Sequence, residues 1–133
     1  MPNKIRVMTN AAAPATGTYS QAIRTGDLVF VTAQTGRNAE TGKLEDGLEA
    51  QTHQMLANVE AILNACGCSP ADIVKVTLFL ADIKDFKAVD RIYAAWLPGL
   101  GITALPARTA FAAAGLPAGA LVMLEVVAAY PTE

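Results

Sequence analysis

The run Ile73–Leu80 restricts the fold of this chain more than any other segment, because its eight residues are nearly all apolar. Only Lys75 and Thr77 interrupt it. An apolar run of this length is typical of a strand that is covered on at least one face and lies centrally in a sheet. The sequence therefore predicts a β-sheet that contains this segment.

Five further segments have the composition or the alternation of strands. They are residues 4–8, 21–24, 28–32, 107–113 and 120–129. Gly and Pro separate several of these segments, as in Gly26-Asp27 and Gly115-Leu116-Pro117, which read as turns. Six strands are therefore expected in all.

Two segments repeat apolar residues at three- and four-residue steps, which predicts two helices. In the first, the repeat is formed by Leu48, Thr52, Met55, Leu56, Val59, Ile62, Leu63 and Cys66. Gly67 is suited to end this helix in a left-handed cap. In the second, Asp82 or Asp85 can cap the start and Pro98 stops the helix, and the repeat is formed by Phe86, Val89, Tyr93 and Trp96.

The order of these elements is βββαβαββ, which predicts an α+β fold with both helices on one face of the sheet. The chain has 133 residues, and no internal repeat or long linker divides it. A length near 130 residues suits one domain. A single domain covering residues 1–133 is therefore expected.

Charge and hydropathy exclude several classes of protein. The formal net charge is −2 and no basic face is visible, whereas a general nucleic-acid binder usually has one. Two long uncharged stretches, residues 92–107 and 109–124, are broken by Gly and Pro, and both are shorter than the roughly 20 apolar residues of a spanning helix. No signal peptide is recognisable, so a cytoplasmic protein with no nucleic-acid or membrane partner is expected.

The cysteines and the single histidine suggest no metal site. Cys66 and Cys68 form a C-x-C pair with no second pair to complete a zinc site. A free cysteine usually behaves as a small apolar residue. His53 lies in line with Glu60 and Asn64 on the polar side of the first helix, where a solvated side chain is expected.

The last third of the chain is almost free of charges, since only Arg108, Glu125 and the terminal Glu133 are charged from Ile92 onward. Arg108 and Glu125 each lie in an apolar, strand-like run, where a charge is costly unless it is paired or meets a ligand. One interpretation is an ion pair between them across neighbouring strands. The other is a binding site in which the arginine holds a carboxylate and the glutamate positions water or accepts its proton. A ligand between the two groups would satisfy both interpretations.

Short motifs are spread over almost the whole chain. The most specific are Pro106-Ala107-Arg108 and, 17 residues after that arginine, Leu124-Glu125. The others are Gly17-Thr18-Tyr19-Ser20-Gln21, Val31-Thr32-Ala33-Gln34-Thr35-Gly36, Thr41-Gly42, Ala50-Gln51-Thr52, Asn58-Val59, Asp72-Ile73-Val74-Lys75 and Asp85-Phe86. In these motifs the chain resembles the YjgF/RidA family of reactive intermediate (imine/enamine) deaminases.

The resemblance implies a chorismate-mutase-like fold, with a six-stranded mixed sheet and two helices on one face. It also implies a homotrimer with a ligand site at each subunit interface, and no metal or organic cofactor. Within that site it implies that Arg108 binds the substrate carboxylate, that Glu125 orients or activates water, and that Tyr19 lines the cleft. Thr32 and Ala33 match the segment that supplies a hydroxyl and a backbone N–H to the ligand.

The chain departs from the pattern of the family that it resembles at four positions. Thr18 stands where many members have proline. Ala110 stands where a cysteine is often found, which removes any thiol role but leaves a backbone contact. Asp90 replaces a cleft asparagine, and Arg37 stands where relatives are often apolar. Asp90 and Ala110 are counted as substrate-binding candidates. The four departures leave Arg108, the residue expected to bind the carboxylate, in place, but they leave the range of substrates open.

The activity that the resemblance implies is hydrolysis of small enamine or imine acids, such as 2-aminoacrylate, to 2-keto acids and ammonia. Two alternatives are a non-catalytic module that binds 2-keto acids and a pathway-specific deaminase of an aminomuconate-like acid. A third is the ribonuclease role in older descriptions of the family, which the acidic balance argues against. Trp96 and the apolar last third of the chain supply more apolar surface than is needed to cover one face of a sheet. Because large exposed apolar patches usually mark interfaces, we expect that the chain is not a monomer.

Overall fold

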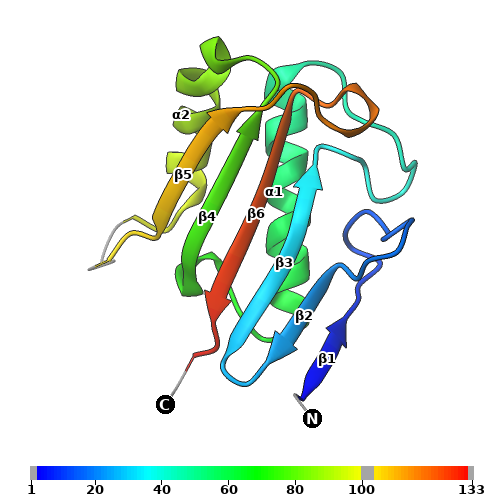
Figure 1. Ribbon diagram of the computed structural model, residues 1–133, viewed down its shortest axis with the longest axis vertical. Helices are drawn as coiled ribbons and strands as arrows, with labels where there is room; N and C mark the ends of the chain where they lie inside the picture. The colour runs from blue at the N-terminus through cyan, green and yellow to red at the C-terminus, as the bar shows by residue number, and fades with distance from the viewer. Residues whose placement is uncertain (1–2, 100–103, 132–133) are drawn as a thin grey trace.

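Six strands form one mixed sheet, and two helices lie on one of its faces, as Figure 1 shows for the computed structural model. The structure describes residues 3–99 and 104–131. The strands are β1 (Lys4–Val7), β2 (Ala22–Thr25), β3 (Leu28–Thr35), β4 (Ile73–Leu80), β5 (Ala107–Ala112) and β6 (Val122–Ala129). Their order across the sheet is β1-β2-β3-β6-β4-β5. The pair β4–β5 is parallel and the other four pairs are antiparallel.

The order of elements and the fold class agree with the sequence analysis, and both are confirmed. The largest difference in length is in β3, which continues to Thr35, three residues beyond its predicted end. Asp82 accepts a hydrogen bond from the backbone N–H of Lys84 at 2.9 Å, and so caps the short 3-10 turn Ile83–Asp85 that leads into the second helix. Asp85 makes no side-chain cap.

The helices α1 (Leu48–Ala65) and α2 (Phe86–Trp96) cover the same face of the sheet. α1 packs on β3 and β6, and α2 packs on α1. Each buried Leu, Ile or Met side chain contributes roughly 1.5–3 kcal/mol to folding. The largest fully buried side chains are Met55, Leu56, Ile62 and Leu63 from α1 and Leu78, Leu80 and Leu124 from the sheet.

The C-terminal end of α1 has the cap that the sequence predicted. Gly67 has a φ of 84°, a left-handed conformation that glycine adopts at little cost. Its N–H donates to the carbonyl of Asn64 at 3.1 Å, and the N–H of Cys68 donates to the carbonyl of Leu63 at 2.9 Å. This is a Schellman motif, which satisfies carbonyls that the helix itself leaves unpaired.

A buried polar side chain and a close backbone contact, both from α1, fix the end of β3. The amide of Asn58 donates to the carbonyls of Thr35 at 3.3 Å and Arg37 at 2.8 Å. Between those two residues, Gly36 lies directly on the backbone of Gln51, where a Cβ added to the glycine would come within 2.4 Å of the Gln51 Cα. The motif residues of α1 therefore set the position of the strand that leads into the candidate site.

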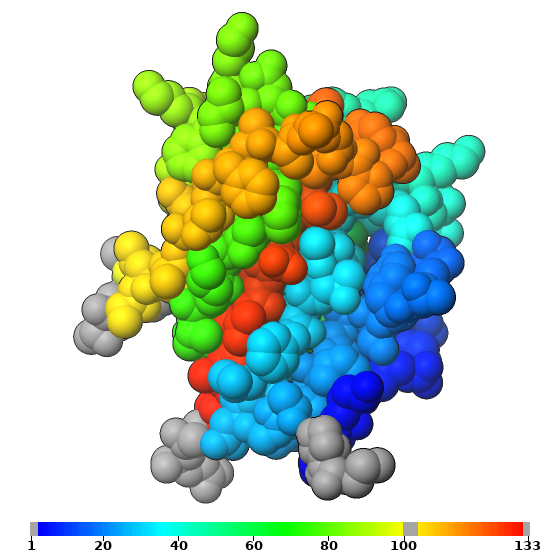
Figure 2. Space-filling view, viewed as in Figure 1, coloured from blue at the N-terminus to red at the C-terminus, as the bar shows by residue number. Residues whose placement is uncertain are grey.

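The other face of the sheet, which we call the open face, carries no helix among the described residues. Figure 2 shows this face from the front. Large apolar side chains are exposed on it, including Leu28, Phe30 and Phe111, each at least 40% accessible. The ring of Phe111 also packs edge-on against Phe79, with 5.3 Å between the centroids. A surface of this kind usually marks an interface.

None of the helices in the described parts of the chain is long and apolar enough to cross a membrane.

Candidate functional site

Glu125 lies beside a β-bulge. The pairing of β3 with β6 shifts register between Val31 and Gln34, so Thr32 and Ala33 on β3 lie opposite the single residue Glu125 on β6. A bulge of this kind disrupts the hydrogen-bond ladder locally and changes the direction of side chains, which is why bulges are frequent beside active sites. The structure thus brings together three residues that the resemblance assigned to the site.

Glu125 stands in a polar row on the open face. Thr77 of β4 pairs with Glu125 on one side and with Thr109 of β5 on the other. The ammonium of Lys75 donates to the hydroxyl of Thr109 at 2.9 Å. The sequence reasoning singled out neither Lys75 nor Thr77 as a site candidate, although a spacing of two residues places both on one face of a strand.

The hydroxyl of Thr32 is already oriented. It donates to the carbonyl of Ser20 at 2.7 Å, while the backbone N–H of Thr32 donates to the carbonyl of Gln21 at 2.9 Å. A hydroxyl has one proton and two lone pairs. Because its proton is committed to Ser20, the oxygen of Thr32 is available as an acceptor for an N–H group.

Tyr19 shares a cavity with the bulge. The cavity has a volume of about 470 Å³, and its lining includes Tyr19, Thr32, Ala33 and Arg37. Ala118, in the connection between β5 and β6, also lines it with a φ of 56°, a left-handed conformation that is uncommon for a residue with a side chain. Backbone conformations of this kind persist only where the surrounding structure holds them, and they cluster at functional sites.

A buried glutamine holds the loop that carries Tyr19. Gln21 is 2% exposed. Its carbonyl oxygen accepts from the N–H of Thr9 at 2.7 Å, and its amide donates to the carbonyls of Thr9 at 3.0 Å and Ala13 at 2.9 Å. Because all three bonds run to backbone groups of residues 9–13, this side chain fixes the path of the loop before Tyr19.

The surroundings of Tyr19 lower the pKa of its phenol. Partial burial raises the pKa of Tyr19. The hydrogen bond from the backbone N–H of Thr16 and the charge of Arg37 lower it, and together they outweigh burial, so the pKa lies below the ordinary value. Arg37 is held beside the ring by a hydrogen bond to the carbonyl of Pro14 and by another to the Thr16 hydroxyl at 3.5 Å.

Arg108 lies on β5, at the edge of the sheet farthest from β3. It pairs with the buried Val76 of β4, so its side chain points toward the helices. There its Nη1 donates to Oδ1 of Asp90 at 2.5 Å. The guanidinium carbon also lies 5.2 Å from the ring centroid of Phe86 and 5.3 Å from that of Tyr93, within the range of cation–π attraction.

Tyr93 remains neutral beside this cation. Its burial raises the pKa of Tyr93 above the ordinary value, and the nearby Asp90 carboxylate acts in the same direction, while the charge of Arg108 opposes both. The ring therefore presents its face to the guanidinium, and Asp90 remains the counter-ion of Arg108.

The interpretation of Arg108 and Glu125 as an ion pair across neighbouring strands is wrong. β4 lies between β5 and β6, and the two side chains point to opposite faces of the sheet. Asp90 of α2 is the partner of Arg108 instead. The order of the strands, which depends on pairing between segments distant in sequence, separates Arg108 from Glu125. The local apolar pattern around each residue carries no information about that order.

The candidate residues therefore form two groups in one chain. Arg108 and Asp90 form the first, which we call the clamp region, and Ala110 follows Arg108 on the same face of β5. The second is the bulge region, which consists of Tyr19, Thr32, Ala33 and Glu125. Three strand spacings separate β3 from β5, or about 14 Å.

The two regions have complementary chemistry. The clamp region offers a planar cation that can hold a carboxylate. The bulge region offers a carboxylate, a hydroxyl oxygen and a phenol, which can accept or donate protons. Within residues 3–99 and 104–131, no three His, Cys, Asp or Glu side chains lie close enough together to hold a metal ion.

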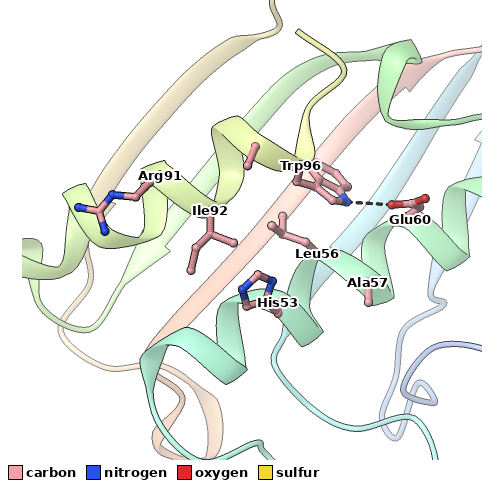
Figure 3. Close-up of a pocket in the computed structure, with 8 residues that line it drawn as sticks. His53, Leu56, Ala57, Glu60, Arg91, Ile92 and Trp96 are labelled. Carbon is pink, nitrogen blue, oxygen red and sulfur yellow. Dashed lines mark hydrogen bonds between the residues drawn. The ribbon is translucent and has the colours of Figure 1, made fainter.

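A second cavity, of about 440 Å³, lies between α1 and α2 on the outer side of the helices. Figure 3 shows the indole of Trp96 donating to Glu60 at 2.9 Å, with His53 and Arg91 toward the other end of the groove. His53 is exposed, as the sequence predicted. The rest of its lining is apolar, with Leu56, Ala57, Ile92 and Ala95, and none of the candidate site residues lines it.

Comparison with known proteins places these features in a family. The family model described as Endoribonuclease L-PSP matches residues 9–130. A Reactive Intermediate Deaminase A, chloroplastic, from Arabidopsis thaliana is 42% identical over 123 residues, which are 92% of this chain but only 64% of that protein's length. A 2-iminobutanoate/2-iminopropanoate deaminase from Rattus norvegicus is 37% identical over 123 residues, which are 92% of this chain and 87% of that protein.

Solved structures agree with the sequence comparison. The structure of the YjgF gene product from E. coli has a TM-score of 0.89 at 32% identity and covers 96% of this chain and 99% of its own. That of RidA from an Antarctic Psychrobacter has a TM-score of 0.88 at 36% identity and covers 94% and 98%. The chain therefore belongs to the Endoribonuclease L-PSP family, also called the YjgF/RidA family.

Proposed function

We propose that this chain hydrolyses small 2-enamine and 2-imine acids, such as 2-aminoacrylate, to 2-keto acids and ammonia. The observation that carries the proposal is the guanidinium of Arg108, which is held at a sheet edge by Asp90 and two aromatic rings yet has a side chain that is 28% accessible. An exposed planar cation suits a small carboxylate ligand. The names of the relatives, deaminases of reactive intermediates and of 2-iminobutanoate, support the same chemistry.

In the proposed reaction the enamine takes up a proton at C3 and becomes an iminium ion, the protonated imine. Water then adds to C2 and gives up a proton to the carboxylate of Glu125, which passes it to the nitrogen. The C–N bond of the tetrahedral intermediate breaks, its hydroxyl becomes the carbonyl of the keto acid, and the hydroxyl proton leaves with the nitrogen, so that ammonia is released in its protonated form. General acid–base help of this kind is typically worth about 10²–10⁴-fold.

Each remaining group has one task in this scheme. Arg108 holds the substrate carboxylate and so fixes the position of C2. The oxygen of Thr32, whose proton is committed to Ser20, accepts a hydrogen bond from the N–H of the imine. Tyr19 closes the site and donates a hydrogen bond from its phenol. Ala33 supplies a backbone N–H.

The proposal includes a homotrimer in which each site lies between two subunits. The clamp region lies at the β5 edge and the bulge region lies centrally in the sheet, on the opposite face of one chain, so a second copy is needed to bring them together. The exposed apolar side chains of the open face provide a surface for such an assembly. Heterologous contacts that close into a ring are the usual way to build a trimer.

A coupled assay tests the proposal. A dehydratase generates 2-aminoacrylate from serine, and the formation of pyruvate is followed with and without this protein. We expect acceleration by the wild type, loss of it in Arg108→Ala and a fall in turnover of at least tenfold in Glu125→Gln. Glu40→Gln, the same change at an exposed loop position, serves as the control and should leave the rate unchanged. Full activity in Arg108→Ala would exclude the proposed role of the arginine.

The same assay separates the alternatives. Saturable binding of 2-ketobutyrate without turnover of any imine would indicate a binding module, and turnover limited to an aminomuconate-like acid would indicate a pathway-specific deaminase.

The proposal also places the protein in the cytoplasm. Its two cysteines are free thiols, which suits a reducing compartment, and cell fractionation tests this point.

A further inference from the structure

The ion pair in the clamp region places a negative charge beside the cation that is proposed to bind an anionic ligand. Arg108 is the cation of the candidate site, and the carboxylate of Asp90 already lies 2.5 Å from its Nη1. This is the only salt bridge found among the described residues. A ligand carboxylate that approaches the guanidinium must therefore enter beside a negative charge.

The surroundings of Arg108 keep this arrangement in place. Asp90 is flanked on α2 by Phe86, four residues before it, and Tyr93, three residues after it, a spacing that puts all three on one side of the helix. Both rings lie within 5.3 Å of the guanidinium carbon. The arginine is thus held by its carboxylate partner and two ring faces at once, and it cannot turn away from Asp90 without losing these contacts.

The pair is nevertheless accessible to a ligand. The side chains of Arg108 and Asp90 are 28% and 39% accessible. A guanidinium has five N–H donors, and the contact with Asp90 uses one of them; no second hydrogen-bond partner is found among residues 3–99 and 104–131. A ligand can therefore touch the guanidinium and the Asp90 carboxylate at the same time.

We infer that Asp90 is a specificity-determining residue that selects acids carrying a positively charged nitrogen next to the carboxylate. This inference rests on the proposed function. A protonated imine (iminium) acid places its carboxylate on Arg108 and its cationic N–H on Asp90, so that each charge meets its opposite. A simple anion, such as a 2-keto acid, satisfies Arg108 but meets repulsion from Asp90.

The selection acts on substrate and product in opposite directions. Hydrolysis converts the iminium acid and water into a 2-keto acid and an ammonium ion, so the cationic nitrogen leaves the carbon that carries the carboxylate. The remaining keto acid then has no positive group to offer Asp90. The clamp region therefore retains the substrate and favours release of the product.

Binding of two stable analogues to the folded protein tests the inference. 2-Aminobutyrate carries an ammonium beside its carboxylate, and 2-ketobutyrate has a carbonyl at the same carbon. Their dissociation constants are measured by calorimetry for the wild type, Asp90→Asn and Asp90→Ser. In both variants we expect 2-ketobutyrate to bind about tenfold more tightly and 2-aminobutyrate to bind more weakly, because the negative charge is gone.

Two controls separate the possible outcomes. Asp46→Asn makes the same chemical change at an exposed position and should leave the ratio of the two constants as in the wild type. Arg108→Ala should abolish binding of both analogues. If it does so while Asp90→Asn and Asp90→Ser keep the wild-type ratio within twofold, or lose both ligands equally, Asp90 only supports the arginine and the inference is overturned. If Arg108→Ala binds both analogues normally, the proposed function itself fails.

Discussion

Arg108 and Glu125 lie on opposite faces of the sheet, and β4 separates their strands. Asp90 holds the guanidinium on the side of the helices, whereas the carboxylate of Glu125 stands on the open face beside the bulge of β3. An acid of three or four carbons spans only a few ångström, so one copy of the chain does not place both groups on it. A site that uses both groups needs two copies.

We therefore expect two inactive variants to restore activity when they are mixed. Arg108→Ala keeps an intact bulge region and Glu125→Gln keeps an intact clamp region. After subunit exchange, a 1:1 mixture should recover about a quarter of the wild-type activity, because that share of interfaces in a symmetric ring combines two intact regions. The unmixed variants, treated in the same way, are the controls. Activity that never exceeds theirs would place both groups in one subunit.

The close contact between Gly36 and Gln51 makes a prediction about stability. A methyl group at residue 36 would lie 2.4 Å from the Cα and the carbonyl oxygen of Gln51, and backbone atoms cannot rotate away as a side chain can. Gly36→Ala should lower the free energy of unfolding by about 1–3 kcal/mol. Gly115→Ala, where nothing lies within 4 Å, is the matched control. Urea denaturation at equal protein concentration compares them, and equal midpoints would contradict the contact.

The two thiols should react at different rates. Burial, with the neighbouring Cys66 thiol as the next cause, raises the pKa of Cys68 from 9.0 to about 12. Since the thiolate is the reactive form, this shift alone makes Cys68 about 10³-fold less reactive near neutral pH. An aromatic disulfide reagent should therefore modify Cys66, which is partly exposed, well before Cys68. Cys66→Ser and Cys68→Ser assign the phases, and equal rates in the two variants would contradict the prediction.

The same shift makes stability depend on pH. The folded state holds the proton of Cys68 more tightly than the unfolded chain, so its contribution is fully present below pH 9 and is lost as the pH rises toward about 12. Cys68→Ala should flatten the fall in stability over this range. Cys66→Ala, which removes the neighbouring thiol, should only reduce the effect.

The two shifted tyrosines should titrate in a fixed order. The Thr16 hydrogen bond and Arg37 lower the pKa of Tyr19 against the effect of partial burial, whereas burial raises the pKa of Tyr93. Ultraviolet absorbance of the phenolate, followed as the pH rises, should show Tyr19 ionising before Tyr93. Tyr19→Phe should remove an early part of the titration and Tyr93→Phe a late part. Arg37→Gln should delay the early part, and an unchanged curve would exclude the influence of Arg37.

Much of the fold was predictable because its signals are local. The apolar steps of α1, the glycine after it and the apolar run of β4 each define an element within a few residues. The element order then limits how a sheet and two helices can pack. The residue patterns already predicted six strands, and the family resemblance added that their sheet is mixed, which the structure confirms.

The parts that could not be predicted depend on contacts between distant segments. That β4 lies between β5 and β6 is decided by pairing of the whole sheet, and it separates Arg108 from Glu125. The partner of Arg108 is Asp90, 18 residues earlier and on a helix. The bulge at Thr32 and Ala33 is likewise invisible in the sequence, since both residues fit an ordinary strand. The roles of the site residues stay predictions, and in the proposed reaction they depend on a second copy of the chain.

The bulge of β3 also limits how this protein can change in evolution. Val31 and Gln34 both face the helices although they are three positions apart in a strand, so Thr32 and Ala33 together act as a spacer of fixed length. Deleting either one would turn Gln34 outward and move Gly36 out of its close contact with the backbone of Gln51. New ligand preferences at residues 32 and 33 can therefore arise by substitution, whereas insertions and deletions there would be removed by selection for folding.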